Sequence, residues 1–492
     1  MYLLLQQTHL KTHMDGAQYI SPRESPVRTE SHLVKLSLIF SVILGLAVAL
    51  IDLKLLVLLV VGATVAALFL VRFDLGILVF VLLVPLTIQL PSGIHHMISY
   101  SLSGILGFSW LMKKLASDQR FSSLDRWLLL FMFVYIMWSA LCSLASSYSG
   151  EGLLVTFRSL LFFVIFYILF DWMKTERKLN MILNSMILAG VISSFSVLVE
   201  LLQVGISSVF TIQGTIRLAG IYANPNTLGM HLAVILPLAL GRLVFVDLPQ
   251  KRWWGFLYVF PICLALFFTF SRSAWLAVCV SGGIVLSRFK LGRWFLFAVI
   301  LAMILFVVAS PDLRDLVIEV SRIEQGLTFR PLLWQGGIGI FKDHLSFGVG
   351  PGAFKHYIAE YFPPYPWRWP IVEFAGVAGG DSHNFFITKG AEMGIVGMLL
   401  AFLLFLVFFR AYSISIKRTE GTALHYLVGV CGAITAGFFV RAFFEGQGLL
   451  TRGGLAHDMY FWILMAFTLR AGELSLNQRA KAREKAAKSC EL

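Results

Sequence analysis

The chain has 492 residues, of which 58% are apolar and only 14% are charged, and its formal net charge is +13. Soluble domains are about 45–50% apolar and about 25% charged, so this composition excludes an ordinary soluble domain and predicts an integral membrane protein. The basic residues lie in short connectors and near the C-terminus, where membrane topology accounts for them, so no nucleic-acid partner is expected.

The chain opens with a polar stretch over residues 1–32. This stretch contains Arg23, Glu24 and Arg28 and lacks an apolar core followed by a cleavage signal. We interpret it as a cytoplasmic N-terminal leader rather than as a signal peptide.

Long apolar segments follow the leader along most of the chain. A helix that crosses the hydrocarbon core of a bilayer needs about 17–25 mostly apolar residues. Such segments are predicted at residues 33–51, 54–71, 75–91, 97–112, 127–145, 153–171, 180–203, 227–246, 254–270, 273–287, 293–310, 384–409, 422–440 and 455–470. The sequence therefore predicts an all-α polytopic membrane protein with about 12–14 transmembrane helices. Residues 33–310 would form a first bundle, residues 384–471 the C-terminal helices, and residues 472–492 a basic cytoplasmic tail.

Basic residues lie in alternate connectors, which indicates how the chain is oriented. Lys and Arg are retained on the cytoplasmic side of a membrane. The basic connectors contain Lys113, Lys114, Arg120 and Arg126; Lys174, Arg177 and Lys178; Lys251 and Arg252; Arg288, Lys290 and Arg293; and Arg410, Lys417 and Arg418. The pattern predicts an even number of crossings with both termini inside, and it places residues 204–226, 270–273 and 311–383 on the outer face.

The longest outward stretch, residues 311–383, is expected to form a loop domain. It opens with an amphipathic piece over residues 312–324 and continues through a glycine-rich part at residues 336–352. The tryptophans of an aromatic and proline cluster at residues 361–370 suit the membrane interface. A structureless loop of this length is uncommon unless it has a function.

Two arginines on the outer face run against the charge bias. Arg217 lies ahead of Asn224-Pro225-Asn226, and Arg272 lies between two apolar segments. A guanidinium is always charged and binds phosphate oxygens through paired donors, so two of them would suit a pyrophosphate. Asn224 and Asn226 flank a proline and are expected to end one segment and begin the next. In the alternative interpretation, Arg217 snorkels to the interface and Arg272 pairs with a lipid phosphate.

A histidine lies where the long outward stretch re-enters the membrane. His383, in Asp381-Ser382-His383, can take a proton near neutral pH, as a general base must. Asp381 is close enough in sequence to orient it, and His344 competes for the same role. The alternative is a helix cap at Asp381 or Ser382 followed by an interfacial histidine.

Motifs of several other chemistries are absent from the sequence. There is no phosphate loop of an ATP-driven motor, no Asp-x-Asp pair and no His-Glu-x-x-His metal motif. The five cysteines show neither metal-binding spacing nor a disulfide framework. We therefore expect no metal and no cofactor, with arginines stabilising the charge of a leaving group.

Several short motifs occur in a fixed order between residues 125 and 465. They are Arg217-Leu218-x-Gly220, Asn224-Pro225-Asn226, Phe270-Ser271-Arg272-Ser273, Arg330-x-x-x-Trp334, Phe347-Gly348-Val349-Gly350 and Ser382-His383-Asn384. This ordered set, together with the long outward loop, resembles the O-antigen ligase and O-antigen polymerase superfamily. The first hundred residues carry no signal of the family.

The resemblance implies a GT-C-like, inverting, metal-independent glycosyltransferase of the bacterial inner membrane, with its loop domain and active site facing the periplasm. Its donor would be an undecaprenyl-pyrophosphate-linked glycan. Arg217 and Arg272 match the arginines that hold the donor pyrophosphate, and His383 matches the histidine that activates the acceptor hydroxyl. The resemblance and the outer position give a second rank of candidate substrate-binding residues, namely Arg330, Asp343, His344, Asn224, Asn226, Arg452 and Asp381, with Arg441 and Glu445 ranked below them.

The sequence leaves the acceptor open. The leading interpretation is a ligase whose acceptor is a lipid A–core sugar, with membrane lipids as further partners. A polymerase, whose acceptor is another lipid-linked repeat, and a protein O-glycan ligase would share the same donor site. A polyprenyl-lipid transporter is less favoured, because it calls for charges near mid-membrane or an internal repeat, and neither is evident in the sequence.

Overall fold

The computed structural model describes residues 64–89, 92–117, 121–211, 214–222, 224–245, 252–288, 293, 330–361, 380–450 and 454–490. The chain divides into two compact units, Met1–Val65 and Ala66–Leu492, and all elements below belong to the second. The predicted leader, the predicted segment 33–51 and the amphipathic piece at 312–324 lie outside the described residues. So do residues 54–63 of segment 54–71 and residues 294–310 of segment 293–310.

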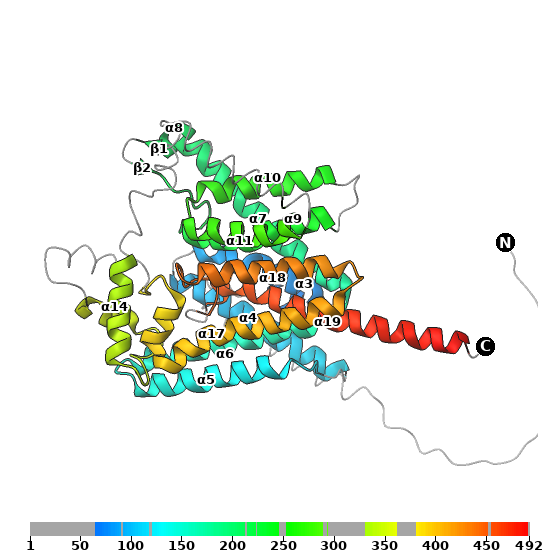
Figure 1. The fold of residues 1–492 in the computed structure, drawn as a ribbon, viewed down its shortest axis with the longest axis horizontal. Coiled ribbons are helices and arrows are strands. Elements are labelled where there is room, and N and C mark those ends of the chain that lie inside the picture. The colour runs from blue at the N-terminus through cyan, green and yellow to red at the C-terminus, as the bar shows by residue number, and fades with distance from the viewer. Residues whose placement is uncertain are drawn as a thin grey trace, which may run out of the picture. The chain divides into compact units, whose positions relative to one another are not determined.

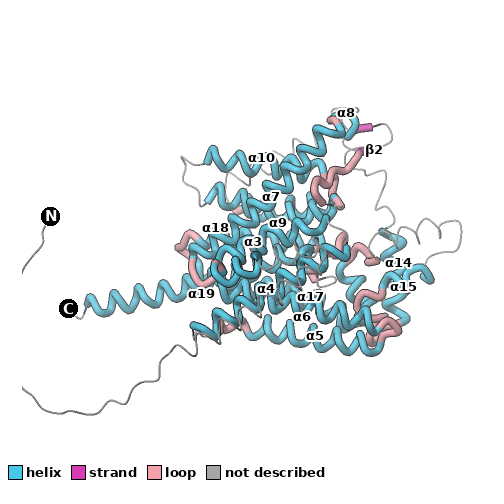
Figure 2. Tube along the Cα trace, turned by 180° about the vertical axis from the view of Figure 1, so that it is seen from behind, coloured by secondary structure: helices cyan, strands magenta, loops and turns pink. Residues whose placement is uncertain are grey.

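Helices form most of the described chain (Figure 2). In order they are α3 (Phe73–Leu86), η1 (Thr87–Gln89), α4 (Ser92–Ser117), α5 (Arg126–Ala145), α6 (Ser149–Trp172), α7 (Glu176–Val204), α8 (Ile206–Val209), α9 (Pro225–Phe245), α10 (Arg252–Phe268), α11 (Arg272–Ser287), α14 (Arg330–Asp343), α15 (Phe354–Tyr357), η4 (Ile358–Tyr361), α17 (Phe385–Thr419), α18 (Leu424–Arg441) and α19 (Leu455–Cys490). A hairpin of two-residue strands, β1 (Phe210–Thr211) and β2 (Gly214–Thr215), is the only sheet in the described ranges. The predicted all-α fold is confirmed.

The helices also confirm a multi-pass membrane protein. Within the described ranges, six are long and apolar enough to cross a membrane, namely α5, α6, α7, α9, α17 and α18. Shorter apolar helices lie at Phe73–Leu86, Gly255–Phe268 and Arg272–Ser287. For eleven of the predicted segments, the first residue lies within five residues of the first residue of a described helix. The total of about 12–14 crossings and the domain boundaries stay predictions, because the other segments are not described.

The predicted C-terminal tail is helical. α19 begins at Leu455, where the last crossing was predicted, and continues to Cys490. Residues 476–484 of this helix are exposed. The basic residues of this stretch therefore extend the last helix beyond the bundle.

In the bundle, α5 packs on α6, and α17 packs on α18 and α19 (Figure 1). The two ends of this bundle differ in the segments that they contain. At one end, Phe385 of α17 donates its N–H to the Ala442 carbonyl after α18 at 2.8 Å. At the other end, a cavity of about 280 Å³ is lined by residues that include Phe245, Arg288, Tyr412 and Tyr426. The first end holds predicted outward segments and the second holds basic connectors, as the charge rule requires.

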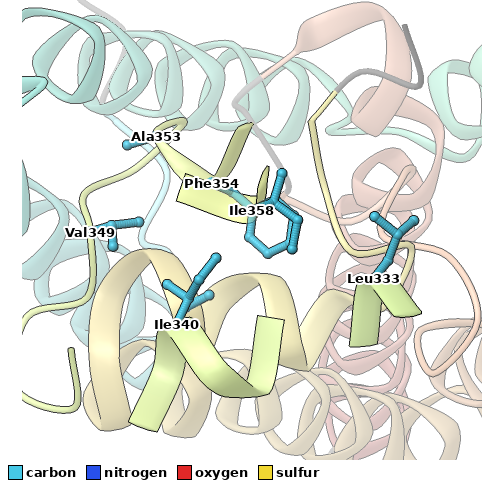
Figure 3. Packing of buried hydrophobic residues seen from close by; sticks show 7 residues of the cluster. Leu333, Ile340, Val349, Ala353, Phe354 and Ile358 are labelled. Carbon is cyan, nitrogen blue, oxygen red and sulfur yellow. The ribbon is translucent and has the colours of Figure 1, made fainter. Parts of the chain in front are cut away.

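The described part of the predicted loop domain is folded. α14, α15 and η4 share a buried apolar cluster with α17 (Figure 3), made of Leu333, Ile340, Val349, Ala353, Phe354, Ile358 and Ala391. Gly336 and Gly337 of α14 permit this close packing, because a Cβ added at them would lie 2.5 Å from Ile358 and 2.6 Å from Ile387, respectively. Part of the glycine-rich stretch is therefore a helix packing surface.

α17 is interrupted near its start. Gly394 has φ 66° and ψ −162°, which breaks the helical hydrogen bonding. The carbonyls of Ala391 and Glu392 accept bonds instead from the N–H groups of Val349 and Gly350, each at 2.9 Å. A helix can be broken at membrane depth only where other protein groups replace its hydrogen bonds, and this loop segment does so. The break leaves a short first piece of α17 that begins at the predicted site.

Candidate active site

The start of α17 is tied to the connector that follows α18. Asn384 caps α17 by accepting bonds from the N–H groups of Phe386 and Ile387, each at 3.0 Å. The side-chain nitrogen of Asn384 donates to the Phe443 carbonyl at 2.9 Å. His383, which directly precedes this cap, is thereby held against the connector.

His383 and Glu445 form a largely enclosed pair. Nδ1 of His383 lies 3.0 Å and 3.2 Å from the two carboxylate oxygens of Glu445. The His383 side chain is 12% exposed, and that of Glu445 is fully buried. His383 has a left-handed backbone, φ 51°, which is held by a 2.9 Å bond from its N–H to Asp381. Its Nε2 makes no hydrogen bond to any described residue, so this nitrogen is available to a substrate hydroxyl.

The surrounding charges set the protonation state of the pair. Burial alone would lower the pKa of His383, but Glu445 and Asp381 raise it to about 9. Burial raises the pKa of Glu445, and the positive charges of His383, Arg441 and Arg330 outweigh this effect and lower it. At neutral pH the imidazole is therefore protonated, whereas an isolated histidine with a pKa of about 6.5 would be mostly neutral.

Two arginines lie beside the same carboxylate. Arg330, the first residue of α14, has Nη2 3.5 Å from Oε2 of Glu445. Arg441, the last residue of α18, is fully buried and donates through Nη1 to the Gln447 carbonyl. The Nε and Nη2 atoms of Arg441 have no hydrogen-bond partner among the described residues. Because buried donors without partners are costly, this end of the bundle suits an anionic ligand.

The two predicted donor arginines lie at a second cluster. Arg217 donates through Nε to the Thr269 carbonyl at 2.9 Å and through Nη2 to Oδ1 of Asn226 at 2.5 Å. Ser271 donates to the same Asn226 oxygen at 3.1 Å. Arg272 follows Ser271 directly and is the first residue of α11. Arg217 therefore contacts the turn from which Arg272 extends.

The loop that carries Arg217 is fixed by α7. Oε2 of Glu200 accepts bonds from the N–H groups of Ala219 at 2.9 Å and Gly220 at 2.6 Å. Gly220 has φ 56°, and a Cβ at this position would overlap Ser196. The glycine of the Arg217 motif is thus required by both its backbone angle and its close packing.

A chain of hydrogen bonds joins the two clusters. Thr227, in the first turn of α9, donates to the side-chain oxygen of Gln447 at 3.0 Å. The backbone carbonyl of Gln447 accepts from Arg441, and Thr227 is adjacent to Asn226, the partner of Arg217. One end of the bundle therefore gathers segments at residues 217–227, 269–272, 381–384 and 441–447, together with Arg330.

Some predicted site residues lie elsewhere. Asp343 and His344 are at the opposite end of α14 from Arg330, about 20 Å away at 1.5 Å per residue. Asn224 lies at the site end of the bundle, just before α9, but its side chain acts locally and accepts the backbone N–H of Asn226 at 2.8 Å. Arg452 lies outside the described residues.

Other residues of the site were missed or ranked low by sequence reasoning. The sequence ranks Glu445 below His344, although Glu445 is the one acidic residue in the apolar connector 442–454, a position where a charge is costly. Gln447 and Thr227 carry no sequence signal, and Ser271 is marked only as part of the Arg272 motif, because their hydrogen bonds depend on helices that meet only in the folded chain.

Asp381, His383 and Glu445 are also the only metal-ligating group of three found in the described ranges, with ligand atoms within 4.8 Å of one another. Two carboxylates and an imidazole could hold a divalent cation. However, Nδ1 of His383 is already bonded to Glu445, and Arg330 places positive charge beside the same carboxylate. The arrangement favours an ion-pair network over a metal centre.

Comparisons with known proteins bear on this arrangement. A family model described as O-Antigen ligase matches residues 256–402, which include Arg272, Arg330 and His383. The chain is also similar to the Exopolysaccharide production protein ExoQ of Rhizobium meliloti (strain 1021), with 27% identity over 286 residues. That match covers 55% of this chain and 61% of the relative, which is less than two thirds of its length. The resemblance to the O-antigen ligase superfamily is confirmed.

Proposed function

We propose that this chain, which resembles the O-antigen ligase superfamily, is an inverting, metal-independent glycosyltransferase of the bacterial inner membrane. It moves an undecaprenyl-pyrophosphate-linked glycan onto a sugar of the lipid A–core at the periplasmic face. The observation that carries the proposal is the meeting, at one end of the bundle, of the His383–Glu445 pair with the segments that hold Arg217 and Arg272.

In this proposal Arg217 and Arg272 bind the donor pyrophosphate. Arg217 is oriented by Asn226 and by the Thr269 carbonyl, so its planar fork is held in place before the donor arrives. Charge develops on the pyrophosphate as the glycosidic bond breaks, and fixed donors in a site that excludes water stabilise that charge strongly. Arg441, with unused donors in a buried position, adds positive potential at the same end.

His383 activates the acceptor. The acceptor hydroxyl oxygen attacks the anomeric carbon from the face opposite the pyrophosphate, and the bond from that carbon to the pyrophosphate oxygen breaks. The bonding electron pair leaves with undecaprenyl pyrophosphate, and the hydroxyl proton passes to Nε2 of His383. Nδ1–H stays bonded to Glu445, whose negative charge stabilises the imidazolium that forms.

A polymerase is the second candidate, because the printed name of the relative concerns exopolysaccharide production. In a polymerase, the acceptor hydroxyl belongs to another lipid-linked repeat. In a protein O-glycan ligase, a third alternative, it belongs to a protein side chain. The donor arginines and the histidine base serve all three acceptors, so the reaction class is the same.

The test is transfer by the purified full chain. Undecaprenyl-pyrophosphate glycan is supplied with lipid A–core, with excess lipid-linked repeat, or with a protein acceptor, and products are identified by mass spectrometry. We expect a glycan–lipid A–core product that His383→Gln forms only at a low rate. Longer lipid-linked chains would identify the polymerase, whereas movement of the donor between leaflets with no new glycosidic bond in any arm would overturn the transferase proposal.

A further inference from the structure

A second concave site lies at the end of the bundle opposite the candidate active site. A cavity of about 420 Å³ opens between the start of α3, the last turns of α4 and the first turns of α7. Its lining consists of Val71, Arg72, Phe73, Asp74, Leu75, Leu78, Lys113, Arg177 and Met181. Neither the proposed reaction nor the comparisons assign a role to it.

Three cations of this lining are not neutralised by ion pairs. Arg72, Lys113 and Arg177 are exposed, and none forms an ion pair with a described residue. The one acidic group in the lining, Asp74, interacts electrostatically with Lys113, but its main partners lie outside the lining. It accepts a bond from Trp172 at 2.6 Å and pairs with Lys178 at 3.3 Å. The cavity is therefore a positively charged recess that suits an anion.

The recess also has an apolar side. Val71 is 77% exposed and Leu75 is 47% exposed, although both precede or begin an apolar helix. Lys113 and Arg177 belong to connectors that the charge rule assigns to the cytoplasmic side. Basic pockets between helices at this level of a membrane bind lipid head groups, with the acyl chains lying along neighbouring apolar side chains.

We propose that this recess binds the head group of an anionic phospholipid of the cytoplasmic leaflet. The lipid phosphate lies among Arg72, Lys113 and Arg177, and its acyl chains lie along Val71 and Leu75. A free phosphate would share the interaction with the cations but would leave the apolar side chains uncovered, so the lipid is the occupant that fits both parts. The proposal does not depend on the glycosyltransferase function.

The experiment measures lipid retention by the purified full chain. The protein is incubated in detergent with equal amounts of phosphatidylglycerol and phosphatidylcholine, and the retained lipid is counted by native mass spectrometry. The double variant Arg72→Gln/Arg177→Gln is compared with Lys481→Gln/Arg483→Gln, which removes the same charge from the exposed part of α19. A third arm adds inorganic phosphate in large excess.

We expect wild-type protein to retain phosphatidylglycerol preferentially, the recess variant to lose this preference by about thirtyfold, and the α19 variant to keep it. If the double variant does not fold, Lys113→Gln alone should weaken retention by about fivefold. Equal retention of the two lipids, or equal loss in the α19 variant, would overturn the proposal. Displacement of phosphatidylglycerol by inorganic phosphate would also overturn it and indicate a site for a free anion.

Discussion

At the scale of single residues, the His383–Glu445 pair determines how the proposed reaction responds to pH. Only the neutral imidazole can take the proton from the hydroxyl of the acceptor sugar. The carboxylates of Glu445 and Asp381 raise the pKa of His383 to about 9. The neutral fraction is about 1% at pH 7 and about half at pH 9, so the rate of a single turnover should rise about fiftyfold over this range. The measurement is the pH profile of transfer with donor saturating.

Glu445→Gln serves as the matched variant for that profile. It removes the main carboxylate that raises the pKa of His383, so the rising limb should move toward lower pH while the plateau rate falls. His383→Gln should show low activity without a titrating limb. A wild-type rate that falls between pH 7 and pH 9 would mean that His383 acts in its charged form, as a donor to the substrate rather than as a base.

The arginine at the start of α11 is expected to need its planar fork. Arg272→Lys keeps the charge but loses the paired donors, and loss of one fixed contact should cost about 2–4 kcal/mol, or about thirty- to nearly a thousandfold in single-turnover rate. Arg288→Lys is the control, since Arg288 lies at the other end of the same helix. Arg272→Lys protein that inserts normally and transfers as fast as the Arg288→Lys control would remove this arginine from the mechanism.

The Asp381–His383–Glu445 group makes a prediction about metal. His383, Arg330 and Arg441 already balance the buried carboxylate of Glu445, so no cation is needed to neutralise it. We expect transfer to continue unchanged in excess EDTA and to gain nothing from added magnesium or manganese. Strict dependence on a divalent cation would make these three residues a metal site and would end the metal-independent mechanism.

At the scale of helices and loops, the positions of most helices follow from the sequence. Apolar runs bounded by polar caps such as Asp125, Thr175 and Asn384 define where helices begin, and the structure places helices there. The break in α17 could not be predicted, because a lone glycine such as Gly394 is tolerated inside many helices and the apolar residues continue beyond it. It exists because the segment ending at Gly350, more than forty residues earlier, supplies the missing hydrogen bonds.

That break predicts an unusual sensitivity at Gly348. This residue has φ 68°, and a Cβ there would overlap the backbone of Glu392 and Met393. Gly348→Ala should therefore displace the loop from the break in α17, lower the thermal unfolding temperature in detergent and reduce transfer, with strain and overlap costing at least about 1–3 kcal/mol.

Gly421→Ala is its control. Gly421 has a similar φ of 74°, but a Cβ there would meet no atom within 4 Å. It therefore carries the backbone strain without the overlap. Equal effects of the two substitutions would show that the contact between the loop and α17 contributes nothing to stability or activity.

At the scale of the whole molecule, the sequence predicted the candidate site only in part. Arg217, Asn226, Arg272 and His383 could be singled out because charge or capping residues at the outer ends of apolar segments are unusual. The pairing of His383 with Glu445 could not, because 62 residues separate them and only the antiparallel packing of α17 and α18 brings them together. The separation of Arg330 and Asp343 was not predicted either, because the stretch that forms α14 was expected to belong to a loop and not to a helix.

The orientation of the molecule provides the last prediction. Two candidate membrane helices, α17 and α18, and the crossing predicted at residues 455–470 in α19 lie between residues 346 and 480. Three crossings would place these two positions on opposite sides of the membrane. Because basic residues concentrate at the ends marked by Arg410, Lys417 and the exposed part of α19, position 346 should face the periplasm. Both Ser346 and Ala480 are exposed, so each can be replaced by Cys in a chain whose five native cysteines have been removed.

In intact spheroplasts, a membrane-impermeant thiol reagent should label Ser346→Cys and should label Ala480→Cys only after permeabilisation. The reverse pattern would turn the site toward the cytoplasm, where a lipid A–core acceptor on the periplasmic face could not reach His383. Labelling of both positions in intact spheroplasts would mean that one of the three helices does not cross.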